Sequence, residues 1–275
     1  MIRRSIRERG LVADLLSSNP VSPKPTVIML GGSEGGKIWS DTPDAVEMLA
    51  ELVEQGFTVF SLAYFGAESL PPSLANIPLE YFETAFAWFA EQPEVIPNQY
   101  ALVGGSKGGE LALLLGSRYP QVKAVAAFVP GSVVFQGLCR KSESSWSHGG
   151  KGLPYVPFPL TALPAIIQGA RTGGFLQAYN LALRNTKQTK LAAIPVENVN
   201  GPVLLISGTQ DEMWPSTLMC ERMIARLSEA GFPFPSEHLA LEAGHNVSVD
   251  KRFWPKVVSF LKQEFLEPLA VPPVA

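Results

Sequence analysis

The sequence YALVGGSKGG at residues 100–109 decides the fold, because it joins a short apolar run to a glycine-rich turn that leads into a helix-like pattern. Within it, Gly104, Ser106 and Gly108 form the pattern G-x-S-x-G. A serine on such a strand-to-helix turn has its hydroxyl raised above the sheet, with the positive end of the helix beneath it. The stretch therefore predicts a nucleophile elbow at Ser106. The alternative is a structural or phosphate-binding glycine turn, but the pattern G-x-x-x-x-G-K-[ST] is missing and G-x-G-x-x-G fits poorly.

Apolar runs alternate with helical patterns on both sides of this stretch. The predicted strands, besides 100–103, are 26–30, 57–63, 122–129, 202–207 and 237–242. The predicted helices, besides the one beginning at 111–115, are 43–54, 77–90, 215–229 and 252–265. Strands that alternate with helices form mostly parallel sheets flanked by helices. With the elbow, this rhythm predicts an α/β-hydrolase fold in a single domain over residues 1–275.

Two segments depart from this alternation of strands and helices. Residues 130–200 are rich in Gly, Pro and Ser, and a long irregular stretch inside a domain is typical of a lid or an insertion. It precedes the predicted strand 202–207. The C-terminal residues 267–275 are expected to be a loose tail.

The sequence has three histidines, and their positions single out one as the base. In α/β-hydrolases the order is serine, acid, histidine. His245 follows the predicted strand 237–242, at the edge of the sheet where such folds place their chemistry. His238 lies inside that strand and His148 precedes any acid. Asp211 follows the predicted strand 202–207 and is expected to orient His245, with Glu212 as a rival.

The glycine-rich loop GGSEGG at residues 31–36 follows another predicted strand. Such a loop supplies backbone amides to an oxyanion hole in lipases and esterases. We expect amides of this loop, at Gly32 and most directly at Ser33, to pair with the amide of Lys107. A phosphate-binding turn is the alternative. The side chain of Lys107 is expected to face solvent.

Aromatic residues in and after the insertion are candidates for an acyl pocket, since such pockets have apolar linings. The alternative is that they pack the insertion against the core. The principal candidates are Trp146, Phe158 and Trp214, with Tyr155, Phe175 and Tyr179 as further ones.

Composition excludes several other classes of protein. The net charge is −3 and no basic stripe stands out, which argues against a nucleic-acid partner. The N-terminus MIRRSIRERG leads into no apolar run typical of a secretory signal, and no apolar run is long enough to cross a bilayer. Cys139 and Cys220 have no metal-ligand spacing, so we expect neither a metal nor another cofactor. A cytoplasmic protein is expected, and its oligomeric state is not predicted.

Four stretches also carry a family resemblance. They are AYFGAESLPPSLANIPLEYFETAFAWFAEQPEV, GGSKGGELALLLGSRYPQVKAVAAFVPGSVVFQG, IPVENVNGPVLLISGTQDEMWPS and EAGHNV. Through them the sequence resembles, over almost its whole length, the catalytic domain shared by type I acyl-CoA thioesterases and bile acid-CoA:amino acid N-acyltransferases, which is dienelactone-hydrolase-like. The resemblance implies a triad of Ser106, Asp211 and His245. It also implies attack of Ser106 on an acyl-CoA thioester, followed by hydrolysis of the acyl-enzyme.

The sequence departs from the family pattern in two places. Animal members have a β-sandwich domain before this one, whereas here few residues precede the predicted strand at Thr26. The amino-acid-conjugating members have cysteine as nucleophile, and Ser106 favours hydrolysis because an oxyester is less prone to aminolysis than a thioester. Thioester hydrolysis is therefore the leading hypothesis. A carboxylesterase or dienelactone-hydrolase-like enzyme, an acyl-CoA:amine N-acyltransferase and a non-catalytic binding module are the alternatives.

Overall fold

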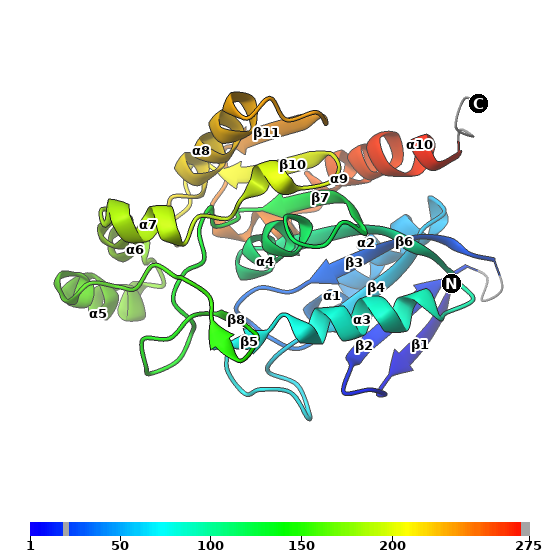
Figure 1. Cartoon of the computed structure of the whole chain (residues 1–275), viewed down its shortest axis with the longest axis horizontal. Coiled ribbons are helices and arrows are strands. Elements are labelled where there is room, and N and C mark those ends of the chain that lie inside the picture. The colour runs from blue at the N-terminus through cyan, green and yellow to red at the C-terminus, as the bar shows by residue number, and fades with distance from the viewer. Residues whose placement is uncertain (19–21, 271–275) are drawn as a thin grey trace.

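The computed structural model describes residues 1–18 and 22–270 and shows one eight-stranded sheet with helices on both faces (Figure 1). The strand order is β1-β2-β4-β3-β6-β7-β10-β11. Strand β2 is antiparallel to both of its neighbours, β1 and β4, and the strands from β4 to β11 run parallel. The bounds are β1 (Ile2–Ile6), β2 (Val12–Ser17), β3 (Lys24–Leu30), β4 (Thr58–Ala63), β6 (Val95–Gly105), β7 (Val122–Phe128), β10 (Val203–Gly208) and β11 (Ser236–Leu241). The predicted α/β fold with a mostly parallel sheet is confirmed.

The central strands have continuous apolar sequences because helices cover both faces of the sheet. In β3, Ile28 and Leu30 pack on one side, whereas Val27 and Met29 pack on the other. The first side is covered by α3, α4 and α8, and the second by α1, α2 and α9. The helices of the chain are α1 (Ile38–Asp41), α2 (Pro43–Glu54), α3 (Glu80–Ala90), α4 (Lys107–Gly116), α5 (Leu163–Thr172), α6 (Leu176–Leu183), α7 (Thr186–Leu191), α8 (Ser216–Glu229), α9 (Trp254–Leu261) and α10 (Glu267–Ala270). Successive side chains of a strand point to opposite faces, so a strand covered twice must be apolar throughout.

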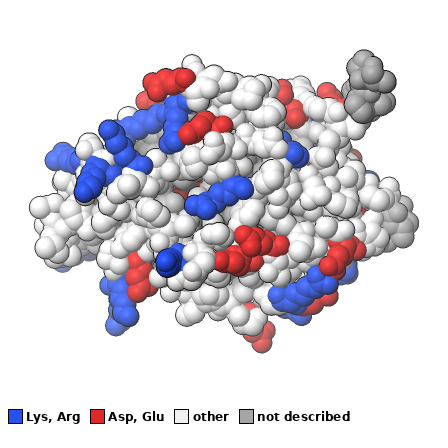
Figure 2. Space-filling model, viewed as in Figure 1, with Lys and Arg blue, Asp and Glu red and all other residues white. Residues whose placement is uncertain are grey.

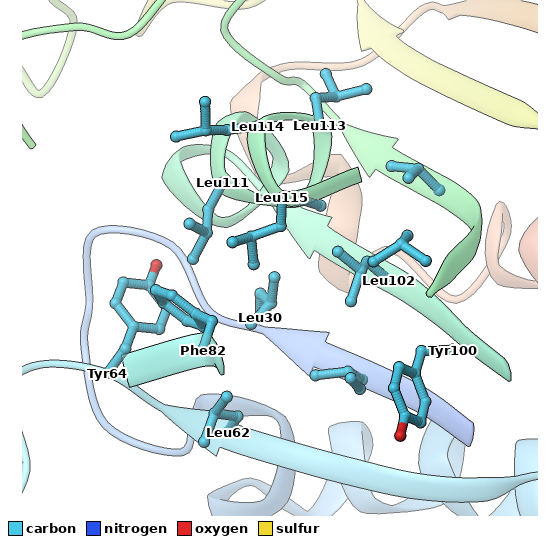
Figure 3. Packing of buried hydrophobic residues seen from close by; sticks show 14 of the residues in the cluster. Leu30, Leu62, Tyr64, Phe82, Tyr100, Leu102, Leu111, Leu113, Leu114 and Leu115 are labelled. Atoms are coloured by element: carbon cyan, nitrogen blue, oxygen red, sulfur yellow. The ribbon is translucent and has the colours of Figure 1, made fainter. Parts of the chain in front are cut away.

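Helix α4 lies at the centre of the first layer and is buried along its whole length (Figure 3). Leu111 and Leu115 belong to the same cluster as Leu30 of β3 and Leu102 of β6. Burying a leucine side chain contributes about 1.5–3 kcal/mol, so this packing fixes the start of α4 firmly on the sheet. The loop before α4 carries Ser106.

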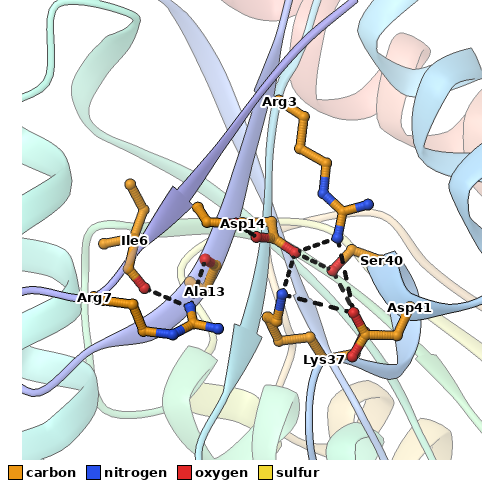
Figure 4. A network of polar contacts seen from close by, with 9 residues as sticks. Arg3, Ile6, Arg7, Ala13, Asp14, Lys37, Ser40 and Asp41 are labelled. Atoms are coloured by element: carbon orange, nitrogen blue, oxygen red, sulfur yellow. Dashed lines mark hydrogen bonds and ion pairs between the residues drawn. The ribbon is translucent and has the colours of Figure 1, made fainter.

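An N-terminal hairpin extends the sheet beyond what the sequence predicted. The prediction that the strand at Thr26 is the first buried one is wrong, because every residue of β2 is buried. Asp14 connects the hairpin to α1, because it accepts hydrogen bonds from Ser5 at 2.6 Å and from Ser40 at 2.7 Å (Figure 4). Asp14 also pairs with Arg3 at 2.6 Å and with Lys37 at 2.5 Å. Burial alone would raise the pKa of this carboxyl, but these four donors together hold it well below its usual range.

Residues 130–200 contain more structure than their composition predicted. Besides α5, α6 and α7, they contribute β8 (Trp146–His148) and β9 (Lys151–Gly152) to a small second sheet with β5 (Ile77–Pro78). The prediction of a helix from Ile77 is therefore wrong for its first turn, because the Ile77 N–H bonds to the Ser145 carbonyl oxygen instead. The insertion forms the left end of the molecule in Figure 1. It follows β7 and precedes β10.

The remaining segments add little to the site. A π-helical segment, Lys262–Leu266, links α9 to α10. The predicted tail at 267–275 begins with α10, and residues 271–275 lie outside the described residues. Lys and Arg side chains gather at the upper left of the face in Figure 2, where Figure 1 shows α7 and α8. No helix in the described part is long and apolar enough to traverse a bilayer.

Candidate active site

Ser106 lies on a turn that only this pattern of glycines permits. Its backbone has φ 55° and ψ −118°, an unfavourable conformation for a residue with a side chain. A Cβ at Gly104 would lie 2.1 Å from the carbonyl oxygen of Gly108, and a Cβ at Gly108 would lie 2.4 Å from that of Gly31. Both glycines are therefore required by close backbone approach. The turn makes Ser106 the residue at the N-terminus of α4, as the sequence predicted.

Ser106, His245 and Asp211 form a continuous chain of hydrogen bonds. Ser106 Oγ lies 2.8 Å from His245 Nε2, and His245 Nδ1 lies 2.9 Å from Asp211 Oδ1. An ionised carboxylate can only accept, so His245 donates its Nδ1–H and leaves Nε2 free to accept the Ser106 hydroxyl proton. This is the arrangement of a serine hydrolase triad. The three residues follow β6, β10 and β11, at the same edge of the sheet.

Asp211 itself is held by the turn after β10. Its Oδ1 accepts hydrogen bonds from the backbone N–H of Met213 at 2.9 Å and of Trp214 at 3.2 Å. The rival acid Glu212 contacts His245 only at the backbone, where its Oε2 accepts the N–H at 3.2 Å. The carboxylate that is hydrogen-bonded to the His245 imidazole is therefore that of Asp211 and not that of Glu212.

The other two histidines lie apart from this chain. His238 Nε2 is 2.8 Å from Ser207 Oγ, within the paired strands β10 and β11. His148 is exposed and lies 3.6 Å from Glu83. The described residues contain no group of three or more His, Cys, Asp or Glu side chains that could bind a metal ion.

The predicted oxyanion donors surround Ser106. Ser33 and Lys107 line the same cavity as Ser106. Lys107 is the first residue of α4, so its N–H has no acceptor within the helix. Gly32 lies on the other side, where a Cβ would come within 3.4 Å of the Ser106 Cβ, and it lines a second cavity. Two backbone amides, those of Ser33 and Lys107, can therefore face a substrate oxygen in the larger cavity.

The side chain of Lys107 is buried, so the prediction that it faces solvent is wrong. Its Nζ lies 2.6 Å from both carboxylate oxygens of Glu110, and neither side chain is exposed by more than 2%. Burial lowers the pKa of the Lys107 ammonium and raises the pKa of the Glu110 carboxyl, while the pair opposes both shifts. The sequence spacing of three residues on a helix allows this pairing.

The prediction that Trp146 binds substrate is also wrong. Its side chain is 0% exposed, and its Nε1–H donates to Glu110 Oε1 at 2.8 Å. A buried indole needs a hydrogen-bond acceptor, and the Glu110 carboxylate of α4 provides one. Trp146 therefore links β8 of the insertion to the helix that follows the nucleophile, and it lies outside the cavity.

A cavity of about 600 Å³ opens beside Ser106 and has a mainly apolar lining. The predicted Phe158 and Trp214 line it, and so do Phe175 and Tyr179, whereas Tyr155 does not. Trp214 is fixed by its Nε1–H, which donates to the Val129 carbonyl oxygen at 2.9 Å. The lining residues that the sequence analysis missed are Gln136, Gly137, Leu138, Cys139, Arg140, Ile166 and Met213. Only Met213, two residues after Asp211, had a positional reason to be expected.

A smaller cavity of about 110 Å³ also borders Ser106 and was not predicted. Its walls come from the loop after β3 and from α1 and α2, with Asn246 beside the base. Ser106 and His245 line both cavities. Ser106 and His245 thus border both a large cavity and a small one, and the lining of the small cavity combines apolar side chains, such as Trp39, with polar ones, such as Thr42.

Comparisons with known proteins agree with this architecture. Residues 77–250, more than half of the chain, match the family described as BAAT / Acyl-CoA thioester hydrolase C terminal. The chain is 30% identical to acyl-coenzyme A thioesterase 1 of Rattus norvegicus over 89% of its own length and 54% of that protein. It is 28% identical to acyl-coenzyme A amino acid N-acyltransferase 2 of Mus musculus over 84% of its length and 51% of that protein. The chain spans about half the length of the curated relatives it matches.

Solved structures show the same fold. A putative dienelactone hydrolase from Klebsiella pneumoniae has a TM-score of 0.60 and 17% identity, and the match covers 95% of this chain and 97% of that one. An acylaminoacyl peptidase from Pyrococcus horikoshii has a TM-score of 0.62 and 14% identity, with 96% of this chain and 41% of that one covered. At these identities the likeness concerns the fold alone. The family match goes further: the chain belongs to the family of BAAT / acyl-CoA thioester hydrolase C-terminal domains.

Proposed function

We propose that this chain is a serine hydrolase that cleaves acyl-CoA-like thioesters through an acyl-enzyme on Ser106. The observation that carries the proposal is the hydrogen-bonded chain of Ser106, His245 and Asp211 at the wall of a large apolar cavity. The relatives named acyl-coenzyme A thioesterases support the choice of a thioester.

The proposed reaction has two balanced halves. Ser106 Oγ attacks the thioester carbonyl carbon while His245 Nε2 takes the hydroxyl proton. The amides of Ser33 and Lys107 stabilise the resulting oxyanion. The C–S bond then breaks, and the leaving thiolate takes the proton from His245. Water attacks the acyl-enzyme with His245 again as base, which releases the free acid and restores Ser106.

The large cavity is the proposed acyl pocket. Its lining is mainly apolar, as expected for a hydrocarbon chain. Cys139 offers a direct probe, because it is half-buried in this lining while Cys220 is buried elsewhere in the core. In the Ser106→Ala variant, bound long-chain acyl-CoA should slow alkylation of Cys139 and leave Cys220 unaffected. Equal alkylation rates with and without saturating acyl-CoA would argue against this pocket.

The functional test compares carriers. Purified protein is mixed with acyl-CoAs of increasing chain length and a thiol reagent, with Ser106→Ala as control. CoA release by the native protein alone supports the proposal, and release equal to that of the variant refutes it. Much faster cleavage of short p-nitrophenyl esters would favour the esterase alternative, and conjugates formed with added amino acids would favour acyl transfer.

We further propose a cytoplasmic location. Both Cys139 and Cys220 are free thiols, which is usual in reducing compartments. Immunodetection of the native protein in separated cell fractions tests this proposal, and enrichment in a membrane-enclosed fraction would contradict it.

A further inference from the structure

The two cavities beside Ser106 differ several-fold in volume, about 600 Å³ against about 110 Å³, yet both are lined by Ser106 and His245. The tetrahedral intermediate of acyl transfer has four substituents: the serine oxygen, the acyl chain, the oxyanion and the leaving group. The structure offers a separate place for each of the last three. The larger, mainly apolar cavity suits the chain, and Ser33 and Lys107, which line it beside Ser106, can supply backbone amides to the oxyanion.

The leaving group must lie close to His245 Nε2, which returns the proton to it. With the acyl chain in the large cavity, the small cavity is the space beside His245 that stays open for this group. Its volume of about 110 Å³ excludes a bulky head group and admits a narrow arm. The proposed function above is assumed in this step.

The small cavity contains a negative charge close to the reaction centre. Glu34 lines it, and a Cβ built on Gly32 would lie 2.8 Å from Glu34 Oε2 and 3.4 Å from the Ser106 Cβ. The carboxylate therefore lies over the same glycine that contacts the nucleophile. Among the residues that line this cavity in the described chain, none is Lys or Arg. The remaining polar side chains are those of Thr42 and Asn246, besides Ser106 and His245.

We propose that this small cavity is the leaving-group site and that Glu34 selects there for a thiol arm that is uncharged next to the sulfur. A carboxylate or phosphate close to the sulfur would be repelled by Glu34, whereas an amide-bearing arm would be accepted through Thr42 and Asn246. The charged part of a larger carrier then lies outside this cavity. An amino acid acting as acceptor would bring its own carboxylate to the same place, so Glu34 also disfavours conjugation relative to hydrolysis.

The experiment uses two acyl thioesters with the same acyl chain. One carries the neutral thiol N-acetylcysteamine, and the other carries thioglycolate, whose carboxylate lies one carbon from the sulfur. The quantity measured is the ratio of kcat/KM for the thioglycolate ester to that for the neutral ester. Because Glu34 is exposed and screened by water, we expect Glu34→Gln to raise this ratio by about three- to tenfold. The matched control Glu229→Gln, at the exposed end of α8, should leave the ratio unchanged.

A second measurement needs only the native protein. Added salt should raise the same ratio, since it screens the repulsion between two exposed charges. An unchanged ratio in Glu34→Gln, or a ratio insensitive to salt in the native protein, overturns the inference. Failure to cleave even the neutral thioester instead overturns the proposed function, so the two failures are distinct.

Discussion

The floor and the wall of the site are built in different ways. The floor is the turn between β6 and α4, where backbone contacts at Gly104 and Gly108 leave no choice of residue. The wall is the insertion at 130–200, which encloses the large cavity mainly with side chains, although Gly137 is also held by a backbone contact, since a Cβ there would lie 2.6 Å from the Leu74 carbonyl oxygen. Under the proposed function, we therefore expect the floor to determine the chemistry and the wall to determine which acyl group reaches it.

The largest effect should come from breaking the hydrogen-bonded chain of Ser106, His245 and Asp211, which we propose to be catalytic. Asp211→Asn leaves the geometry nearly intact but allows the wrong imidazole tautomer, so kcat should fall by up to about 10⁴-fold. Glu212→Gln is the matched control, since the Glu212 carboxylate accepts the backbone N–H of His245 and makes no hydrogen bond with its imidazole. Initial rates of thioester cleavage measure both, and an equal loss in the two variants would contradict the assignment of Asp211.

The Lys107–Glu110 pair lies in the floor and reaches the wall through Trp146. Lys107→Met or Glu110→Gln leaves one fully buried partner without its counterpart, which should cost about 3–5 kcal/mol of unfolding free energy. The double variant should recover most of this loss, because it leaves no uncompensated charge. Denaturant unfolding of all four proteins gives the coupling energy, and additive losses would contradict a tight buried pair.

Asp14 is a buried charge that lies outside both the floor and the wall, so its replacement should affect stability without affecting catalysis. Because hydrogen bonds to charged groups contribute about 1.5–3 kcal/mol, Asp14→Asn should destabilise the fold by about that amount near neutral pH while kcat stays close to native. The pKa of Asp14 is lowered in the folded state, so its stabilisation is fully present above the unfolded pKa of about 4 and is lost gradually as the pH falls from there through the lowered folded-state pKa. The difference in unfolding free energy between the native protein and the variant should therefore shrink from pH 7 to pH 3 without vanishing, because the folded-state pKa lies well below its usual range. A difference that stays constant down to pH 3 would contradict this assignment.

The smallest effect should come from the wall. Ile166→Trp fills part of the large cavity and should shift the preference from long to short acyl chains by about tenfold, without loss of activity on the shortest. Leu218→Trp, at an exposed site on α8, is the control. The chain-length profile of kcat/KM measures the shift, and an unchanged profile would place the acyl chain elsewhere.

The same division explains what could be predicted from the sequence. The floor follows from local rules, because a strand, a tight glycine turn and a helix are contiguous at residues 100–116. Ser106, Asp211 and His245 could be predicted in the same way, because each follows a strand that is recognisable in the sequence. The wall depends on contacts between distant segments, such as Trp146 with Glu110, and neither periodicity nor spacing encodes them. The N-terminal hairpin was missed because its polar Asp14 conceals a buried strand.

The central claim is that Ser106 carries the acyl group between the two halves of the reaction. Rapid mixing with a long-chain acyl-CoA, an acid quench and peptide mass spectrometry test it directly. The account predicts a mass increase equal to one acyl group on the peptide that contains Ser106, absent in Ser106→Ala. CoA release without any such adduct, or an adduct on another residue that turns over at the same rate, would contradict it.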